Sequence, residues 1–138
     1  MYVHVAWATW DRLPLLVGDV ERRVHRAISA KCREMGAEVV ALDGVEDHVH
    51  LLVRLPPSLS LAQLVGQVKG SSSHMATHEI DPHPEFFKWQ GAYGAVSVSP
   101  RALPDVRDYI AHQKTHHAEH SLMPEWEPHT QADSQADS

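Results

Sequence analysis

The sequence contains a single cysteine, Cys32, among its 138 residues. One cysteine cannot form an internal disulfide, and Cys32 falls at an apolar position of a helical pattern, so we expect a buried structural thiol rather than a nucleophile. No apolar run approaches the roughly 18 residues that a membrane-spanning helix requires, and the first residues lack the basic segment and cleavage site of a secretory signal. We therefore expect a cytoplasmic protein without a membrane partner.

Positive charge is also scarce, because twelve Lys and Arg stand against eighteen Asp and Glu, for a net charge of −6. This balance at first argues against a nucleic-acid partner. However, residues 121–138 hold four acids and no Lys or Arg, so residues 1–120 carry twelve basic against fourteen acidic side chains, a net charge of −2. The body of the chain is nearly neutral, and composition leaves a nucleic-acid partner open.

What the chain does have is apolar material and histidine. Its length fits one domain, and 43% hydrophobic residues can build a core without metal or disulfide cross-links. Twelve histidines are many for this length. Each histidine can ligate a metal ion or gain positive charge near pH 6, so the composition permits both a metal site and an anionic partner.

Hydrophobic periodicity predicts the order strand, helix, strand, strand, helix, strand, helix. The strands are expected over residues 2–10, 37–45, 48–55 and 86–99, the helices over residues 18–36, 61–75 and 103–120, and loops over residues 11–14 and 81–84. This order is typical of an α+β fold with a ferredoxin-like or RRM-like antiparallel sheet, helices on one side and an added C-terminal helix. Residues 122–138, which repeat QADS, predict a polar disordered tail beyond a domain of residues 1–121.

Two histidines on one predicted strand form the first candidate site. His48 and His50 lie two residues apart, so alternation along the strand points both side chains to one face while Val49 points to the other. Such a pair can hold a metal ion. It can equally be a polar strand face with hydrogen-bonded histidines, and the pattern alone does not decide between the two.

The last predicted helix carries the second candidate site. A period of 3.6 residues gives it a buried stripe formed by Val106, Ile110 and His117. Tyr109, Gln113 and His116 flank that stripe, where side chains can reach toward a site on the sheet. A structural tyrosine with a buried ring and an exposed hydroxyl is the alternative interpretation.

Four motifs follow one another along the chain. They are His-hydrophobic-His after Asp47, Lys69-Gly70 followed by serines, Trp89-Gln90 before Gly94, and Tyr-Ile-x-x-Gln followed by His-His. Together, in the segments EDHVHLLVRLPPSLSLAQLVGQVKGSSS, FKWQGAYGAVSVS and DYIAHQKTHHAEHS, they resemble the single-tyrosine HUH transposases of the insertion-sequence 200/605 group and their hairpin-associated relatives. The resemblance covers residues 2–121.

The resemblance implies that Tyr109 is the nucleophile and that His48, His50 and Gln113 hold a divalent cation, Mg or Mn. A tyrosine hydroxyl with a pKa of about 10 is a poor nucleophile at neutral pH, and a cation on the scissile phosphate lowers the barrier to its attack. Attack on single-stranded DNA would leave a 5′-phosphotyrosine and a 3′-hydroxyl, and the reverse attack would rejoin the strand. The covalent link keeps the phosphodiester energy, so no nucleotide cofactor is expected, in agreement with the absence of a GxxxxGK[ST] loop.

The resemblance also implies partners, namely hairpin-bearing single-stranded DNA and a second copy of the chain in a homodimer. Candidate contacts to DNA phosphates are Arg12, Arg54, Lys69, Lys88 and Arg101, of which Lys69 matches a family position well. For each of these side chains, an ordinary solvated surface charge is the alternative interpretation.

Two other function classes remain open from the sequence. A domesticated regulator would keep the fold and bind hairpin DNA without cutting it. A small metal-dependent hydrolase would use the histidine-rich last helix. A covalent adduct between protein and DNA separates the transposase from both.

Overall fold

The computed structural model describes residues 1–79 and 87–115. The predicted loop over residues 81–84, the predicted tail over residues 122–138, and both His116 and His117 lie outside the described residues. Within them, strands and helices follow one another in the predicted order.

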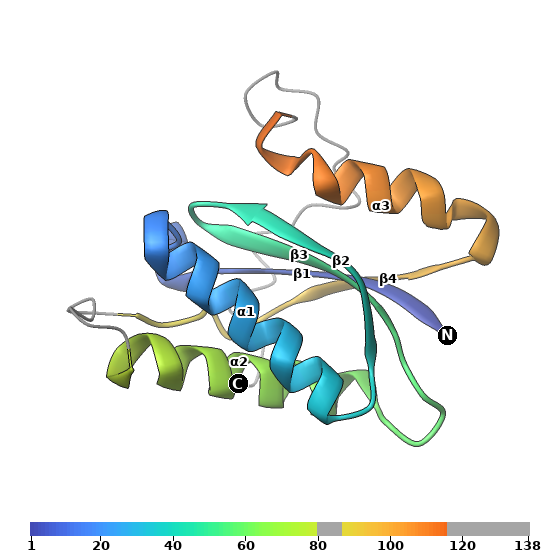
Figure 1. The fold of residues 1–138 in the computed structure, drawn as a ribbon, viewed down its shortest axis with the longest axis horizontal. Coiled ribbons are helices and arrows are strands. Elements are labelled where there is room, and N and C mark those ends of the chain that lie inside the picture. The colour runs from blue at the N-terminus through green and yellow to red at the C-terminus, as the bar shows by residue number, and fades with distance from the viewer. Residues whose placement is uncertain (80–86, 116–138) are drawn as a thin grey trace.

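A four-stranded antiparallel sheet forms the centre of the fold, with the strand order β2-β3-β1-β4 (Figure 1). The strands are β1 (Tyr2–Ala8), β2 (Glu38–Val45), β3 (His48–Arg54) and β4 (Gly94–Val98). The predicted hairpin is confirmed as the β2-β3 pair, turning at Glu46 and Asp47. With helices packed on this sheet, the α+β fold class predicted from the sequence is confirmed.

The first and fourth strands are shorter than predicted. β1 stops at Ala8 because the chain then enters a 3-10 turn, η1 (Trp10–Arg12), in which Asp11 and Arg12 both have positive φ. The last strand covers residues 94–98 instead of 86–99. In the segment before it, one isolated β-bridge joins Trp89 to Thr9. The Trp10 amide donates to the Lys88 carbonyl oxygen and the Gln90 amide donates to the Ala8 carbonyl oxygen, which brings residues 88–90 beside the end of β1.

One face of the sheet carries α1 (Gly18–Glu34) and α2 (Leu61–His78). Alternate residues of β1 and β3 point to this face and pack against the helices in the main core, among them Val5, Trp7, Val49 and Leu51. Ser60 caps α2 as predicted, in a reciprocal pair with Gln63. Cys32 is fully buried in α1, as predicted, and burial raises the pKa of its thiol to about 11.

The other face of the sheet carries α3 (Leu103–Ala111) (Figure 1). A smaller core joins the two layers, formed by Leu52, Val98, Val106 and Ile110. The prediction that this helix runs unbroken to residue 120 is wrong, because α3 ends at Ala111 and His112 has non-helical angles (φ −112°, ψ 29°). The His112 ring caps the end of the helix. Its Nδ1 lies 2.9 Å from the Asp108 carbonyl oxygen and 3.2 Å from Asp108 Oδ1. Residues 113–115 are helical again.

Candidate active site

The two histidines of β3 point to the face covered by α3. In the β1-β3 pairing, His50 is opposite Ala6 and His48 is opposite Ala8. The small alanine side chains leave space on this face for the imidazole rings, whose centroids are 5.0 Å apart. Both histidines have no exposed surface. The structure therefore has both rings on one strand face, as the sequence predicts.

A third histidine, which the sequence analysis missed, joins this pair. His4 of β1 lies on the same face, and its Nε2 is 2.9 Å from His50 Nδ1. The only signal in the sequence is the alternation of YVHVAWA, which places His4 with Ala6 and Ala8 on one side of the strand. That signal does not say which residues lie opposite His4, because the register between two strands is a tertiary property.

His48 is held by the residue before it. His48 Nδ1 lies 2.7 Å from Asp47 Oδ1, and Arg12 Nε lies 3.3 Å from the other carboxylate oxygen. Burial alone would raise the pKa of Asp47, but the hydrogen bond from His48 and the charge of Arg12 outweigh it and lower that pKa. Asp47 is thus a carboxylate at neutral pH that fixes the ring and its tautomer. A carboxylate on one imidazole nitrogen is the usual support for a histidine that binds metal through the other.

Tyr109 of α3 faces the histidines. Its ring centroid is 6.0 Å from that of His50, with the ring planes 81° apart. Tyr109 is 4% exposed and Gln113, beyond the break at His112, is fully buried. The 3.6-residue period predicts both residues at the margin of the buried stripe, whereas the structure buries them about as fully as Val106 and Ile110.

These side chains suit a divalent cation by their chemistry. Two imidazoles and an amide oxygen can hold a divalent ion such as Mn²⁺ and leave open positions for phosphate oxygens. His48 and His50 both engage Nδ1 in the contacts described above, so Nε2 is the nitrogen through which each would bind an ion. The residues present therefore fit a metal site.

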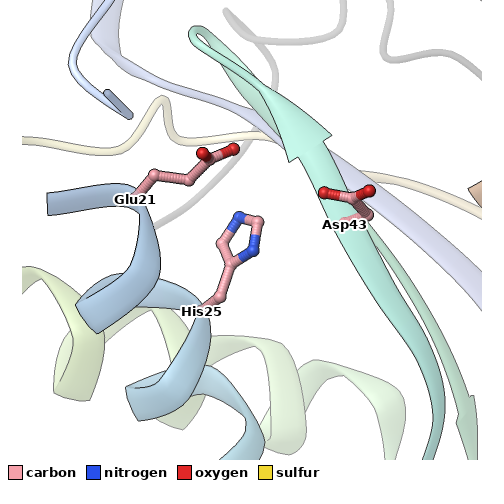
Figure 2. Close-up of side chains that lie close together, drawn as sticks. All are labelled: Glu21, His25 and Asp43. Atoms are coloured by element: carbon pink, nitrogen blue, oxygen red, sulfur yellow. The ribbon is translucent and has the colours of Figure 1, made fainter. Parts of the chain in front are cut away.

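A second histidine–carboxylate cluster lies at the edge of the sheet, formed by Glu21 and His25 of α1 and Asp43 of β2 (Figure 2). One ligand atom from each lies within 4.8 Å of the others, the spacing of a potential cation site. Lys114 is the cation there: its Nζ is 2.9 Å from Glu21 Oε2 and 3.3 Å from Asp43 Oδ1. Burial tends to lower the pKa of Lys114, but its bonds to Glu21 and Asp43 prevail and raise it, so the ammonium stays charged at neutral pH.

The candidate DNA contacts are at the surface, and most of them have protein partners. Arg12 pairs with Asp47, as described, and Arg54 Nη1 is 3.8 Å from Glu38 Oε1. Lys69 donates to the carbonyl oxygens of residues 90 and 92, Lys88 Nζ lies 4.0 Å above the Trp10 ring, and Arg101 is exposed. These contacts do not prevent Arg12, Arg54, Lys69 or Lys88 from binding a phosphate, but each of the four side chains also has a partner within the protein.

Two of these lysines line one groove of 430 Å³, between α2 and residues 88–93. The groove is lined by Ala62, Val65, Gly66, Lys69, Gly70, Ser73, Lys88, Trp89, Gln90, Gly91 and Tyr93. This set of described residues combines two ammonium groups and aromatic rings with no carboxylate. Its charge and stacking surfaces suit a nucleotide.

A sequence model of the family "Transposase IS200 like" matches residues 1–113, which include every residue of the histidine site. The chain belongs to the IS200-like transposase family. It is 26% identical over 116 residues to the transposase for insertion sequence element IS200 of Salmonella typhimurium, a match that covers 80% of this chain and 74% of that protein. The resemblance inferred from the four motifs is thus confirmed.

Solved structures agree with this family. A crystal structure of a proposed transposase from Deinococcus radiodurans R1 has 27% sequence identity and a TM-score of 0.65, over 82% of this chain and 90% of that one. A REP-associated tyrosine transposase bound to a REP hairpin has 16% identity and a TM-score of 0.65, over 84% of this chain and 67% of that one, and so shows the shared fold.

Family membership assigns the chain a DNA-processing role and indicates a metal requirement. The structure adds that none of the described helices is both long and apolar enough to cross a membrane.

Proposed function

We propose that this transposase cleaves and rejoins single-stranded DNA through a 5′-phosphotyrosine intermediate, with Tyr109 as the nucleophile. The observation that carries the proposal is the buried position of Tyr109 against His50, 6.0 Å between ring centroids, on the sheet face that also holds His4 and His48. A purely structural tyrosine has no need of three histidines beneath it.

His48, His50 and Gln113 would hold a Mg or Mn ion. When bound, the ion supplies positive charge that offsets the charge on the scissile phosphate. Asp47 keeps the His48 ring in one orientation through its 2.7 Å contact, and His4 does the same for His50.

In the cleavage step, the Tyr109 hydroxyl oxygen attacks the phosphorus and a new oxygen–phosphorus bond forms. The bond from phosphorus to the 3′ oxygen breaks, that oxygen takes up a proton, and the phenolic proton passes to solvent. The products are a 5′-phosphotyrosine and a 3′-hydroxyl. Rejoining is the same step in reverse, so no nucleotide cofactor is consumed.

The DNA partner would be single-stranded and hairpin-bearing, by extension from the structural relative bound to a REP hairpin. The lysines of the groove, Lys69 and Lys88, would contact phosphates, with Arg12 and Arg54 as further contacts. We also propose that residues 1–121 form the transposase domain with residues 122–138 as a tail, that two copies form a homodimer, and that the protein acts on DNA in the bacterial cytoplasm. A monomeric mass in solution at micromolar concentration would contradict the dimer.

The deciding experiment is incubation with hairpin-bearing oligonucleotides taken from the flanks of the gene. We expect a covalent protein–DNA adduct that forms with Mg²⁺ or Mn²⁺ and is lost with a chelator. Tyr109→Phe should abolish the adduct and leave hairpin binding within about twofold, because only the hydroxyl is removed.

Two results would overturn the proposal. An adduct with Tyr109→Phe would assign the nucleophile to another residue. Tight binding of the oligonucleotides without any adduct would make the chain a DNA-binding regulator instead.

A further inference from the structure

The segment that follows α3 is attached to the sheet edge by Lys114. Its Nζ donates to Glu21 Oε2 at 2.9 Å, to Asp43 Oδ1 at 3.3 Å and to the Gly44 carbonyl oxygen at 3.0 Å. An ammonium group has three hydrogens, so all of its donors have acceptors. Glu21 belongs to α1, which lies on the sheet face opposite α3 (Figure 1). Lys114 therefore ties the two helical layers together around the β2 edge.

The attachment point is level with the histidine pair. In the β2-β3 register, Asp43 is opposite His50, and Gly44 is opposite Val49, the residue between the two histidines. A side chain fixed to Asp43 and Gly44 is thus fixed beside the strand positions of the proposed metal ligands.

Gln113, the residue before Lys114, is the one that needs such support. It lies beyond the break at His112, so the regular hydrogen bonds of α3 end before it. Its side chain is nevertheless fully buried. Three strong contacts at the next residue give the structure a means to hold this segment where α3 itself does not.

We propose that Lys114 is a positioning residue that holds Gln113 in the metal site and so sets the affinity of that site for its ion. The proposal rests on the proposed function, which assigns Gln113 as a ligand. Lys114 does not touch the metal; it acts through the residue before it. Loss of its charge would also leave the carboxylates of Glu21 and Asp43 facing each other without a cation, which favours separation of the layers.

The test is Mn²⁺ binding, measured by calorimetry on full-length protein that also carries Tyr109→Phe, so that no turnover interferes. Lys114→Met keeps most of the side-chain length and removes the charge. We expect it to weaken Mn²⁺ binding about tenfold or more, the usual range for residues that support metal ligands. Lys114→Arg keeps the charge and should stay within about threefold of the parent protein, whereas Glu21→Gln should weaken binding in the same direction as Lys114→Met, by less.

A matched control separates this effect from general loss of an ion pair. Lys31 pairs with Glu34 at 2.8 Å on the side of α1 that faces α2, and Lys31→Met should leave Mn²⁺ binding unchanged. A double-mutant cycle then tests the route: with Gln113→Ala already present, Lys114→Met should cause little further loss, because the residue through which it acts is gone.

The outcomes distinguish this proposal from the proposed function. Unchanged Mn²⁺ binding in Lys114→Met, or an equal loss with and without Gln113, would refute the positioning role while leaving adduct formation by the parent enzyme intact. Absence of Mn²⁺ binding and of any adduct in the parent protein would instead refute both.

Discussion

Gly44 is a position where one added methyl group should separate the strands beneath the site. It lies near the end of β2 and pairs with Val49, between His48 and His50. A Cβ atom at Gly44 would overlap the carbonyl oxygen of His48 and lie 2.9 Å from the Cα of Val49. Because the opposing atoms are backbone atoms, no side-chain rotation relieves the contact. Gly44→Ala must therefore move β2 away from β3.

The expected loss in the free energy of unfolding follows from the contacts that this movement disrupts. Two backbone hydrogen bonds at the hairpin end contribute about 1–3 kcal/mol together, and overpacking of a tight contact costs about 1–3 kcal/mol more. We expect Gly44→Ala to lower the free energy of unfolding by about 2–6 kcal/mol, a large part of the roughly 5–15 kcal/mol of a typical domain. For a chain of this length, the melting temperature should fall by about 6–20 °C.

Gly66→Ala is the matched control. Gly66 lies inside α2, and a Cβ there meets nothing within 4 Å. Alanine at this helical position should raise the free energy of unfolding by about 0.5–1 kcal/mol. Urea unfolding of both variants, followed by tryptophan fluorescence, measures the two changes. A Gly44→Ala protein as stable as the parent would refute the reasoning, because it would mean that the two strands can part without loss.

Two further predictions concern titratable groups. Cys32 is fully buried with a pKa of about 11, so a thiol reagent at pH 8 should label it only after urea unfolds the protein; prompt labelling of the native protein would contradict its burial. Burial lowers the pKa of His25 below its ordinary 6.5 although Glu21 and Asp43 act to raise it. The folded state then favours the neutral form of His25. The contribution of His25 to the free energy of unfolding is therefore complete above pH 6.5 and is lost as the pH falls below that value. His25→Gln should make the free energy of unfolding fall less steeply between pH 7 and pH 5, and an unchanged slope would show that His25 titrates alike in both states.

Local patterns were enough to predict the element order. The 3.6-residue period that contains Val24, Ile28 and Cys32 gave α1, and strand alternation put His48 and His50 on one face. These properties depend on residues a few positions apart, which the sequence states directly. Tyr109 and Gln113 could be selected as partners of the histidines only through the resemblance to a family, because no periodicity relates one element to another.

Contacts between distant elements required the tertiary structure. His4 reaches His50 because β1 and β3 pair in one register out of several that the alternation allows, and a shift by one residue would turn His4 into the main core. The break at His112 and the bond from Lys114 across to Glu21 likewise depend on how α3, β2 and α1 come together. A sequence states which side chains share a face, whereas packing and register decide which of those faces meet.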